Sequence, residues 1–436
     1  MLVVGGIIGA GIFINPAIVA SRLGATGPVL AAWALGGLVA LAGAYAYAEL
    51  GAIFPRAGGQ YVYLKEAYHP LIGFLYGWAL VFIIEGGAIA AVSLVFAEYL
   101  ARLLDWGPST VTPVATGAIA LLAAVNYVGV KPGSRVVNVA TTLKIAAIAL
   151  LVVIGAMANP ESSGLQAPSP GWSQWDWATR LAAFGSALVP ILFAYGGWQQ
   201  TNFVAEELRQ PERTLRVALA AGTAIVVLTY LSVNLAYLRA LGITGLASTS
   251  TPAADLAARV LGAPGERFVA ATIAVSTFGF LDVCILASSR VYFAMASDGR
   301  FFKAVARLHP RYDTPAGAIL VQAGWAIVLA VSGSYAQLLD YVVFADWLFF
   351  GLTVASVFVF RRRLPLAERP TRDGGVPGHP FVSAAFVLVS AFVVVSVVRT
   401  NPVGSAFGAA LLASGVPAYW WWGRATGAPG GHPDAR

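Results

Sequence analysis

The stretch that decides the fold is GGIIGAGIF, residues 5–13, where four glycines interrupt an apolar run that otherwise predicts a membrane helix. Glycine weakens a helix, and backbone polar groups freed inside a bilayer need partners, so non-helical backbone is tolerated there only where protein buries it or a cavity hydrates it. The stretch therefore indicates a functional break in the first membrane span. The alternative is that its small residues only allow two helices to pack closely.

The composition is that of an integral membrane protein. The chain is 58% hydrophobic and 11% charged, with a mean hydropathy of +0.75. Its one cysteine, Cys284, lies in an apolar segment, and its four histidines fall in connecting segments or the tail, so metal and haem sites are not expected. We expect no cofactor. The first residues lack the features of a signal or transit peptide, so we expect the first span to stay in the protein.

Apolar runs of about 20 residues are long enough to cross about 30 Å of hydrocarbon. Twelve such runs predict an all-α polytopic protein. They cover residues 2–22, 27–53, 71–100, 112–129, 136–158, 179–205, 214–240, 266–296, 315–333, 337–360, 381–399 and 402–422.

The basic residues orient these spans. An even number of spans places both termini on one side, and that side carries most of the 27 Lys and Arg residues, including the run Arg361, Arg362, Arg363. The positive-inside rule then predicts cytoplasmic termini in the cytoplasmic membrane. The net charge of +7 follows from the same asymmetry. We therefore expect the lipid bilayer, and not nucleic acid, as the partner of the basic residues.

A second break is predicted in FAYGGW, residues 193–198, where Gly196 and Gly197 follow Tyr195 in the sixth span. Glycine-interrupted segments at corresponding positions predict two inverted repeats of five helices, with a substrate bound between the breaks. Freed amides can hold a carboxylate and freed carbonyls an ammonium, which suits a zwitterion. The single domain would comprise repeat one at about 1–158, repeat two at about 179–360, and two further helices at about 381–422.

Six segments carry a resemblance to a known family. They are GGIIGAGIF, YAELGAIFPRAGGQYVYL (47–64), TTLKIAAIALLVVIG (141–155), LFAYGGWQQTNFVAEEL (192–208), NLAYL (234–238) and SSRVYFAMASDGRFF (288–302). In this order they resemble the amino acid-polyamine-organocation permeases, most closely the L-type amino-acid transporters and their bacterial relatives. The resemblance implies the inverted-repeat fold, alternating access and amino-acid substrates.

The resemblance also implies how the substrate is held. The carboxylate would lie at the backbone amides of Ala10, Gly11 and Ile12. The amine would lie at the carbonyls of Ile7 and Gly196.

Phe193 matches an aromatic residue that closes over the substrate in relatives, although it can equally be a core aromatic. Many relatives have Ser where this chain has Ala10, so only the backbone is expected to hold the carboxylate here. A side chain at Gly9 or Gly11 is expected to enter the carboxylate space. The predicted substrate-binding set is Ile7, Ile8, Gly9, Ala10, Gly11, Ile12, Phe193, Ala194, Tyr195 and Gly196.

Lys144 is the most informative charge. It follows Val136 by eight residues and so lies about 12 Å into the membrane. In lysine-bearing relatives this position occupies the place of sodium, which implies that the ammonium contacts a freed carbonyl of the first break and Ser276 or Thr277. Tyr237 matches a residue linked to the same network. Transport is then expected to be independent of sodium, unless Lys144 only pairs with an acid for structure.

Three acids also lie deep in predicted spans, namely Glu85, Asp282 and Asp346. Ionisable groups inside a membrane are functional candidates. Asp282 stands where relatives usually have Asn, so it can pair with Lys144 or carry a proton. By contrast, Glu49, Glu206 and Glu207 fall at cytoplasmic helix ends, where we expect them to bind arginines or backbone.

The sequence therefore predicts a secondary transporter of amino acids, with neutral L-amino acids favoured, acting as an exchanger or with protons as the coupling ion. A polyamine or organic-cation permease is the alternative within the superfamily. A membrane-embedded enzyme would need a convergent set of catalytic side chains in the spans, and none is visible. A channel would need a repeated filter or a charge ring, which is also not visible.

The loop between the third and fourth spans bears on partners. Animal L-type transporters attach to a single-span glycoprotein through a cysteine in this loop. Here the loop is LLDWGPST, residues 103–110, and contains no cysteine. We therefore expect no disulfide-linked ancillary subunit.

Overall fold

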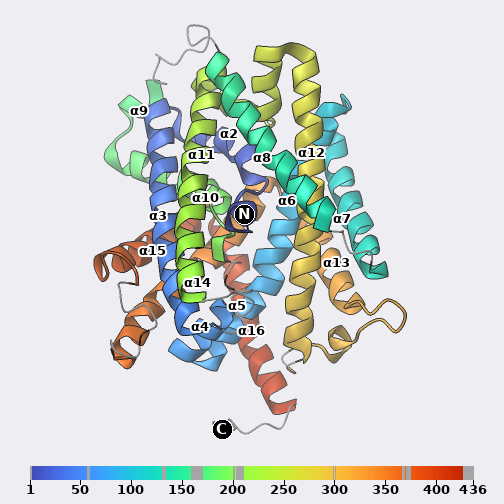
Figure 1. Ribbon diagram of the computed structural model, residues 1–436, viewed down its shortest axis with the longest axis vertical. Helices are drawn as coiled ribbons and strands as arrows, with labels where there is room; N and C mark the ends of the chain where they lie inside the picture. The colour runs from blue at the N-terminus through green and yellow to red at the C-terminus, as the bar shows by residue number, and fades with distance from the viewer. Residues whose placement is uncertain are drawn as a thin grey trace.

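The computed structural model describes residues 2–55, 59–129, 134–158, 170–199, 202, 211–297, 299, 301–365, 369 and 375–425. The regular secondary structure of these ranges is helical, and they contain no strand. In Figure 1 most long helices run roughly along the vertical axis, while α8 crosses the view obliquely.

The helices follow the predicted spans closely. Their bounds are α1 (Leu2–Ile7), η1 (Gly11–Phe13), α2 (Asn15–Leu23), α3 (Thr26–Ile53), α4 (Gln60–Ala67), α5 (Pro70–Ala79), η2 (Leu80–Glu85), α6 (Gly86–Leu103), η3 (Pro108–Thr110), α7 (Val111–Val128), α8 (Ser134–Met157), α9 (Pro170–Gln174), α10 (Trp177–Ala194), α11 (Pro211–Ala247), α12 (Pro252–Ser297), η6 (Lys303–Ala306), α13 (Ala316–Ser332), α14 (Tyr335–Arg363), α15 (Phe381–Thr400) and α16 (Pro402–Ala425). Two of these helices contain one residue with non-helical backbone, Gly242 in α11 and Gly262 in α12, so the part of α12 before Gly262 is a separate helix that precedes the eighth predicted span.

Within the described ranges, eight helical segments are long and apolar enough to cross a membrane, and two shorter apolar helices lie at 144–157 and 316–332. These helices confirm the predicted class, an all-helical polytopic membrane protein. The count of twelve spans and the inverted repeat stay predictions.

The third predicted span contains a π-helical turn, η2, between α5 and α6. A π turn shifts the hydrogen-bond register and leaves carbonyls that need other donors. The hydroxyl of Tyr292 donates to the carbonyl of Val81, and the indole nitrogen of Trp325 donates to the carbonyl of Phe82 at 2.6 Å. Donors from α12 and α13 therefore stabilise the turn, which the uniformly apolar sequence did not predict.

Glycines bring α3 close to the helices around the second break. A Cβ atom at Gly36 would lie 2.4 Å from Ile191 of α10, and one at Gly37 would lie 2.7 Å from Val227 of α11. Close backbone approach through small residues is typical of helix contacts in membranes.

Glu49 confirms its predicted structural role. Its carboxylate accepts two hydrogen bonds from the Arg361 guanidinium, at 2.7 and 2.6 Å, and one from the Val376 amide at 2.7 Å. Only 2% of Glu49 is exposed. This bidentate pair joins the ends of α3 and α14. Glu206 and Glu207 lie outside the described residues.

Candidate functional site

The first predicted break lies between α1, which ends at Ile7, and η1, which begins at Gly11. The amide of Gly9 donates to the Ile7 carbonyl at 2.8 Å. The Ala10 amide has no backbone acceptor among the described residues, and the first amides of η1 have none within their own helix. These are the amides predicted to hold a carboxylate. The side chains of Ile8, Ala10 and Ile12 are apolar and buried in the core, so only the backbone can bind a carboxylate here.

The second predicted break follows α10 at Ala194. Gly197 has a φ of +103°, which side-chain-bearing residues rarely adopt, and a Cβ atom there would lie 2.3 Å from the carbonyl oxygen of Gly6. A Cβ atom at Gly11 would lie 3.1 Å from Ala194. The structure therefore brings the two breaks, almost 190 residues apart in sequence, into contact.

A residue that the sequence did not single out, Tyr230 of α11, bridges the breaks. Its hydroxyl lies 3.2 Å from both the Ile7 carbonyl and the Ala194 carbonyl. The Ile7 carbonyl, which also accepts from Gly9, has both lone pairs engaged in this conformation. The predicted contact between Ile7 and a substrate amine thus requires Tyr230 to release it. The signal available in the sequence was a tyrosine in an apolar helix, which usually needs a hydrogen-bond partner.

The two glycines expected to border the carboxylate space differ in the room beside them. A Cβ atom there would lie 3.4 Å from the ring of Phe280 in α12, which is an ordinary contact distance. A methyl group at Gly9 therefore fits against Phe280, whereas one at Gly11 would press on Asn15 at 3.0 Å. The two glycines predicted to be equivalent are not.

Lys144 of α8 is buried, with 5% of its surface exposed. Its ammonium donates to the Gly5 carbonyl in α1 at 3.3 Å and lies 4.8 Å from the centre of the Phe280 ring. The ammonium thus contacts the first broken span and, through a cation–π interaction, α12. Ser276 and Thr277 are buried nearby on α12, but the described structure has no hydrogen bond between Lys144 and either residue. The Thr277 hydroxyl donates to carbonyls of its own helix.

Asp282 does not pair with Lys144, and no ion pair joins them in the described ranges. Its carboxylate instead accepts a hydrogen bond of 2.6 Å from the Asn126 amide of α7. Tyr237 is fully buried, and its hydroxyl has no partner among the described residues. The predicted links of Asp282 and Tyr237 to Lys144 are therefore absent from this conformation.

Phe193 is partly buried next to the second break and packs against a hydrophobic cluster that contains Ile84 of η2 and Val342 of α14. Tyr195 is fully buried, and its hydroxyl donates to the Trp33 carbonyl at 3.2 Å. Both side chains therefore connect the break to surrounding helices. The Gly196 amide donates to Phe193, while its carbonyl accepts no hydrogen bond from a described residue.

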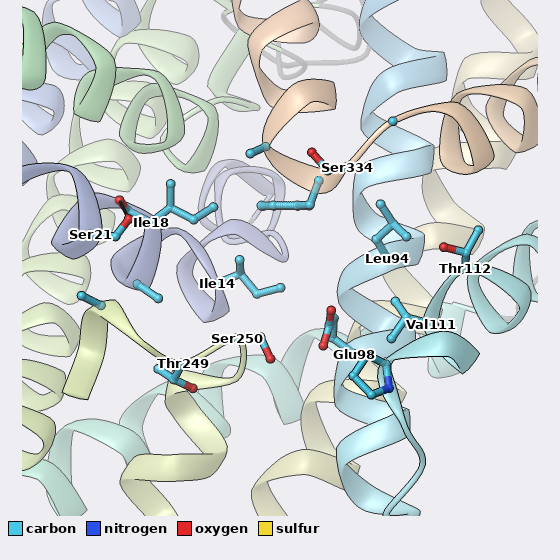
Figure 2. Close-up of a pocket in the computed structure, with 16 residues that line it drawn as sticks. Ile14, Ile18, Ser21, Leu94, Glu98, Val111, Thr112, Thr249, Ser250 and Ser334 are labelled. Carbon is cyan, nitrogen blue, oxygen red and sulfur yellow. Dashed lines mark hydrogen bonds between the residues drawn. The ribbon is translucent and has the colours of Figure 1, made fainter. Parts of the chain in front are cut away.

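A pocket of about 490 Å³ lies beside the start of α2, directly after the first break. Figure 2 shows Glu98 of α6 reaching into the space between Ile14 and Val111. Tyr335, which lines the pocket, donates to the Asn15 side chain at 2.8 Å, and Asn15 donates to the Pro190 carbonyl at 2.7 Å. These bonds tie α14, α2 and α10 together where the pocket meets the first break.

Comparison with known proteins agrees with the resemblance. The family model described as "Amino acid permease" matches residues 1–421. The chain is 31% identical to the b(0,+)-type amino acid transporter 1 of Mus musculus over 407 residues, which are 92% of this chain and 81% of that protein. It is 31% identical to the serine/threonine exchanger SteT of Bacillus subtilis (strain 168) over 422 residues, which are 96% of this chain and 94% of the exchanger.

A third relative extends the range of substrates named among these proteins. The chain is 30% identical to the large neutral amino acids transporter small subunit 2 of Oryctolagus cuniculus over 427 residues, covering 96% of this chain and 78% of that protein. The predicted resemblance is confirmed, and the chain belongs to the amino acid permease family.

Proposed function

We propose that this integral membrane protein carries amino acids across the cytoplasmic membrane by alternating access and without sodium. The observation that supports this most is the contact between two broken helical segments, one of which offers backbone amides that have no backbone acceptor among the described residues. Non-helical backbone at membrane depth marks a binding site in many secondary transporters. Family membership and the substrates named for the relatives support the same function.

The substrate would lie between the breaks as a zwitterion. Its carboxylate would accept hydrogen bonds from the amides of Ala10, Gly11 and Ile12, aided by the positive end of the following helix. Its amine would donate to the Gly196 carbonyl, and to that of Ile7 once Tyr230 has moved. Phe193 would close over the substrate.

The proposed architecture has twelve spans, with the two breaks in the first helix of each five-helix repeat. The pocket in Figure 2 would face outward, because its lining includes the segments between the third and fourth, seventh and eighth, and ninth and tenth spans. The basic end of α14 would then face the cytoplasm, as would both termini. Cys284, within α12, offers no thiol in an outward loop, so we propose no disulfide-linked subunit.

Lys144 would take the place of a coupling cation. Its ammonium already supplies a positive charge and a donor to the first broken span. Substitution by Ala would remove the donor from the Gly5 carbonyl, at a cost of about 1–3 kcal/mol for a buried unsatisfied group. That loss would bias the conformational equilibrium and reduce flux more than substrate binding. Adding Asp282→Asn is not expected to restore flux, because Asp282 binds Asn126 instead.

Proteoliposomes test the proposal. Uptake of labelled alanine, leucine and serine is measured with and without internal amino acid, with and without a pH gradient, and with choline replacing sodium at equal osmolarity. We expect uptake that is unchanged by choline. Stimulation by internal amino acid would identify exchange, and stimulation by the pH gradient alone would identify proton symport. Uptake that requires sodium would refute the role of Lys144, and no uptake of any amino acid would refute the transport proposal.

A further inference from the structure

The pocket in Figure 2 is a second candidate site, separate from the one proposed between the breaks. Its volume of about 490 Å³ lies within the range of small-molecule sites, which is about 300–1,000 Å³. The described residues that line it include none of those predicted to hold the substrate. The contacts proposed for the substrate therefore do not account for this pocket.

A single carboxylate gives the pocket its charge, and we call it the Glu98 pocket. Glu98 of α6 reaches into it, and the other described lining residues are apolar or carry hydroxyl groups. Glu98 keeps partial solvent access and forms no ion pair within the described ranges. The pocket therefore contains a negative charge that no described basic residue pairs with. A cleft with one sign of charge concentrates ligands of the opposite sign.

The basic residue of α6 is engaged elsewhere. Arg102 follows Glu98 by about one helical turn. Its guanidinium donates to the carboxylates of Asp255, at 2.8 Å, and Glu266, at 2.6 Å. Two carboxylates thus pair with this one cation. Arg102 therefore does not neutralise Glu98.

The same ion pairs hold one wall of the pocket in place. Asp255 also accepts a hydrogen bond from the hydroxyl of Thr249, which lines the pocket. Through Asp255, Arg102 therefore ties the segment that contains Thr249 and Ser250 to α6. The Ser250 hydroxyl lies beside the Glu98 carboxylate. Two oxygen-bearing groups are thus already adjacent in the pocket without a ligand.

An ammonium group on an apolar chain matches this lining. An ammonium has three donors and no acceptor, so the Glu98 carboxylate and the Ser250 hydroxyl oxygen can both accept from it. Hydrogen bonds between charged partners are roughly twice as strong as those between neutral ones. Apolar side chains such as Ile14 and Val111 would cover the chain. A hydrated metal ion would gain nothing from these apolar walls.

We propose that the Glu98 pocket binds a primary ammonium group on an apolar chain, at a site separate from the one between the breaks. The ammonium can belong to an incoming amino acid or to a free amine. A ligand there would contact Ile14, whose amide donates to the carbonyl of Gly11 in the first break at 3.3 Å. It would therefore stabilise the conformation in which α2, α6 and the segment before α12 line the pocket.

Thermal unfolding of the purified full-length chain in detergent tests the site without transport. The probe is n-butylamine at constant ionic strength, and n-butanol is its neutral counterpart. A ligand that binds only the folded protein raises the melting temperature as its concentration rises. We expect this rise with n-butylamine and not with n-butanol. Glu98→Gln should weaken the apparent affinity for n-butylamine about tenfold or more. Glu66→Gln, at an exposed side chain, is the matched control and should keep the rise.

Ser250→Phe is a second test, because it keeps the Glu98 charge and places a ring beside it. Ser250 is exposed, so the substitution removes no core packing. We expect this variant also to lose the rise with n-butylamine. No rise in the unmodified protein, or an equal rise in the Glu98→Gln protein, would overturn the inference and leave the proposed function standing.

Uptake into proteoliposomes then identifies the source of the ammonium. A KM for external amino acid that increases about tenfold in Glu98→Gln, with the maximal rate within about twofold, would show that the pocket receives the substrate. An unchanged KM, with loss of inhibition by external n-butylamine, would show that it receives free amines. Both results support the pocket. A rise in melting temperature that depends on Glu98, in a chain that carries no amino acid, would refute the proposed function alone.

Discussion

The two breaks differ in how strictly they require glycine. The first contains four glycines in nine residues, yet a methyl group at Gly9 would meet the Phe280 ring at an ordinary 3.4 Å. The second contains only two, and at Gly197 both the φ of +103° and the carbonyl of Gly6 at 2.3 Å exclude a side chain. The number of glycines in a stretch therefore does not indicate where glycine is indispensable. The distance to the backbone of the opposing segment does indicate where glycine is indispensable.

The breaks also differ in what stabilises them. Side chains from neighbouring helices support the carbonyls of the first, with Lys144 donating to Gly5 and Tyr230 to Ile7. At the second, Gly197 lies directly against the backbone of α1. Substitution of Gly197 should therefore act by steric exclusion, whereas substitution of the side chains that support the first break, such as Tyr230, should act through lost hydrogen bonds.

Gly197→Ala should have the largest effect. The added methyl group would adopt an unfavourable backbone conformation and overlap the Gly6 carbonyl, at a combined cost of about 3 kcal/mol or more. We expect uptake to be lost and the melting temperature in detergent to fall. Gly117→Ala, where a Cβ atom meets nothing within 4 Å, should change neither quantity. Normal uptake by Gly197→Ala would mean that the breaks do not touch during transport.

Gly11→Val should cause the second-largest loss of uptake. Its Cβ atom would lie 3.0 Å from the Asn15 amide and 3.1 Å from Ala194, and its methyl groups would crowd the amides proposed for the carboxylate. Overpacking of this kind costs about 1–3 kcal/mol. Uptake should fall at least about tenfold in protein that remains monodisperse. The control is Gly324→Val, at a site with no neighbour within 4 Å. Near-normal uptake would refute the site assignment.

Tyr230→Phe should have an intermediate effect. It removes the donor that the Ala194 carbonyl shares with Ile7, while Ile7 keeps its bond from Gly9. One lost hydrogen bond costs about 1 kcal/mol, so flux should change about fivefold. Tyr312→Phe, in the segment between α12 and α13, is the control. If Tyr230 only packs, with its ring against Trp33 and Tyr195, the variant should behave as wild type.

Gly9→Ala should have the smallest effect, because the methyl group has room beside Phe280. Uptake and melting temperature should both stay close to those of the unmodified protein, with the change in stability within about 0.5 kcal/mol. The comparison is made in the same proteoliposome assay as for Gly11→Val. Abolished uptake in Gly9→Ala would show that the carboxylate space extends to Gly9 in a conformation other than this one.

Local sequence patterns were sufficient to predict where the helices lie and that Glu49 has a structural role, because hydropathy and helix ends depend on nearby residues. They were insufficient for the π turn of η2, because a continuous apolar run does not reveal a change of helical period. They were also insufficient for Asp282, which the sequence allowed to pair with Lys144 or to carry a proton, whereas its observed partner is Asn126, 156 residues away. Hydropathy indicates how deep a residue lies in the membrane, but it does not indicate which residues of the other helices lie beside it at that depth.

The sequence by itself determined that the chain is a helical membrane protein, where its helices lie, and which two segments interrupt them. Only the tertiary structure decided that Gly197 is packed against Gly6 and that Tyr230 bridges the breaks. The physical reason is that the free energy of transferring a segment into lipid is a sum over its own neighbouring residues, which the sequence gives directly. A hydrogen bond or steric overlap instead depends on distances of a few ångströms between segments that the helix packing alone brings together.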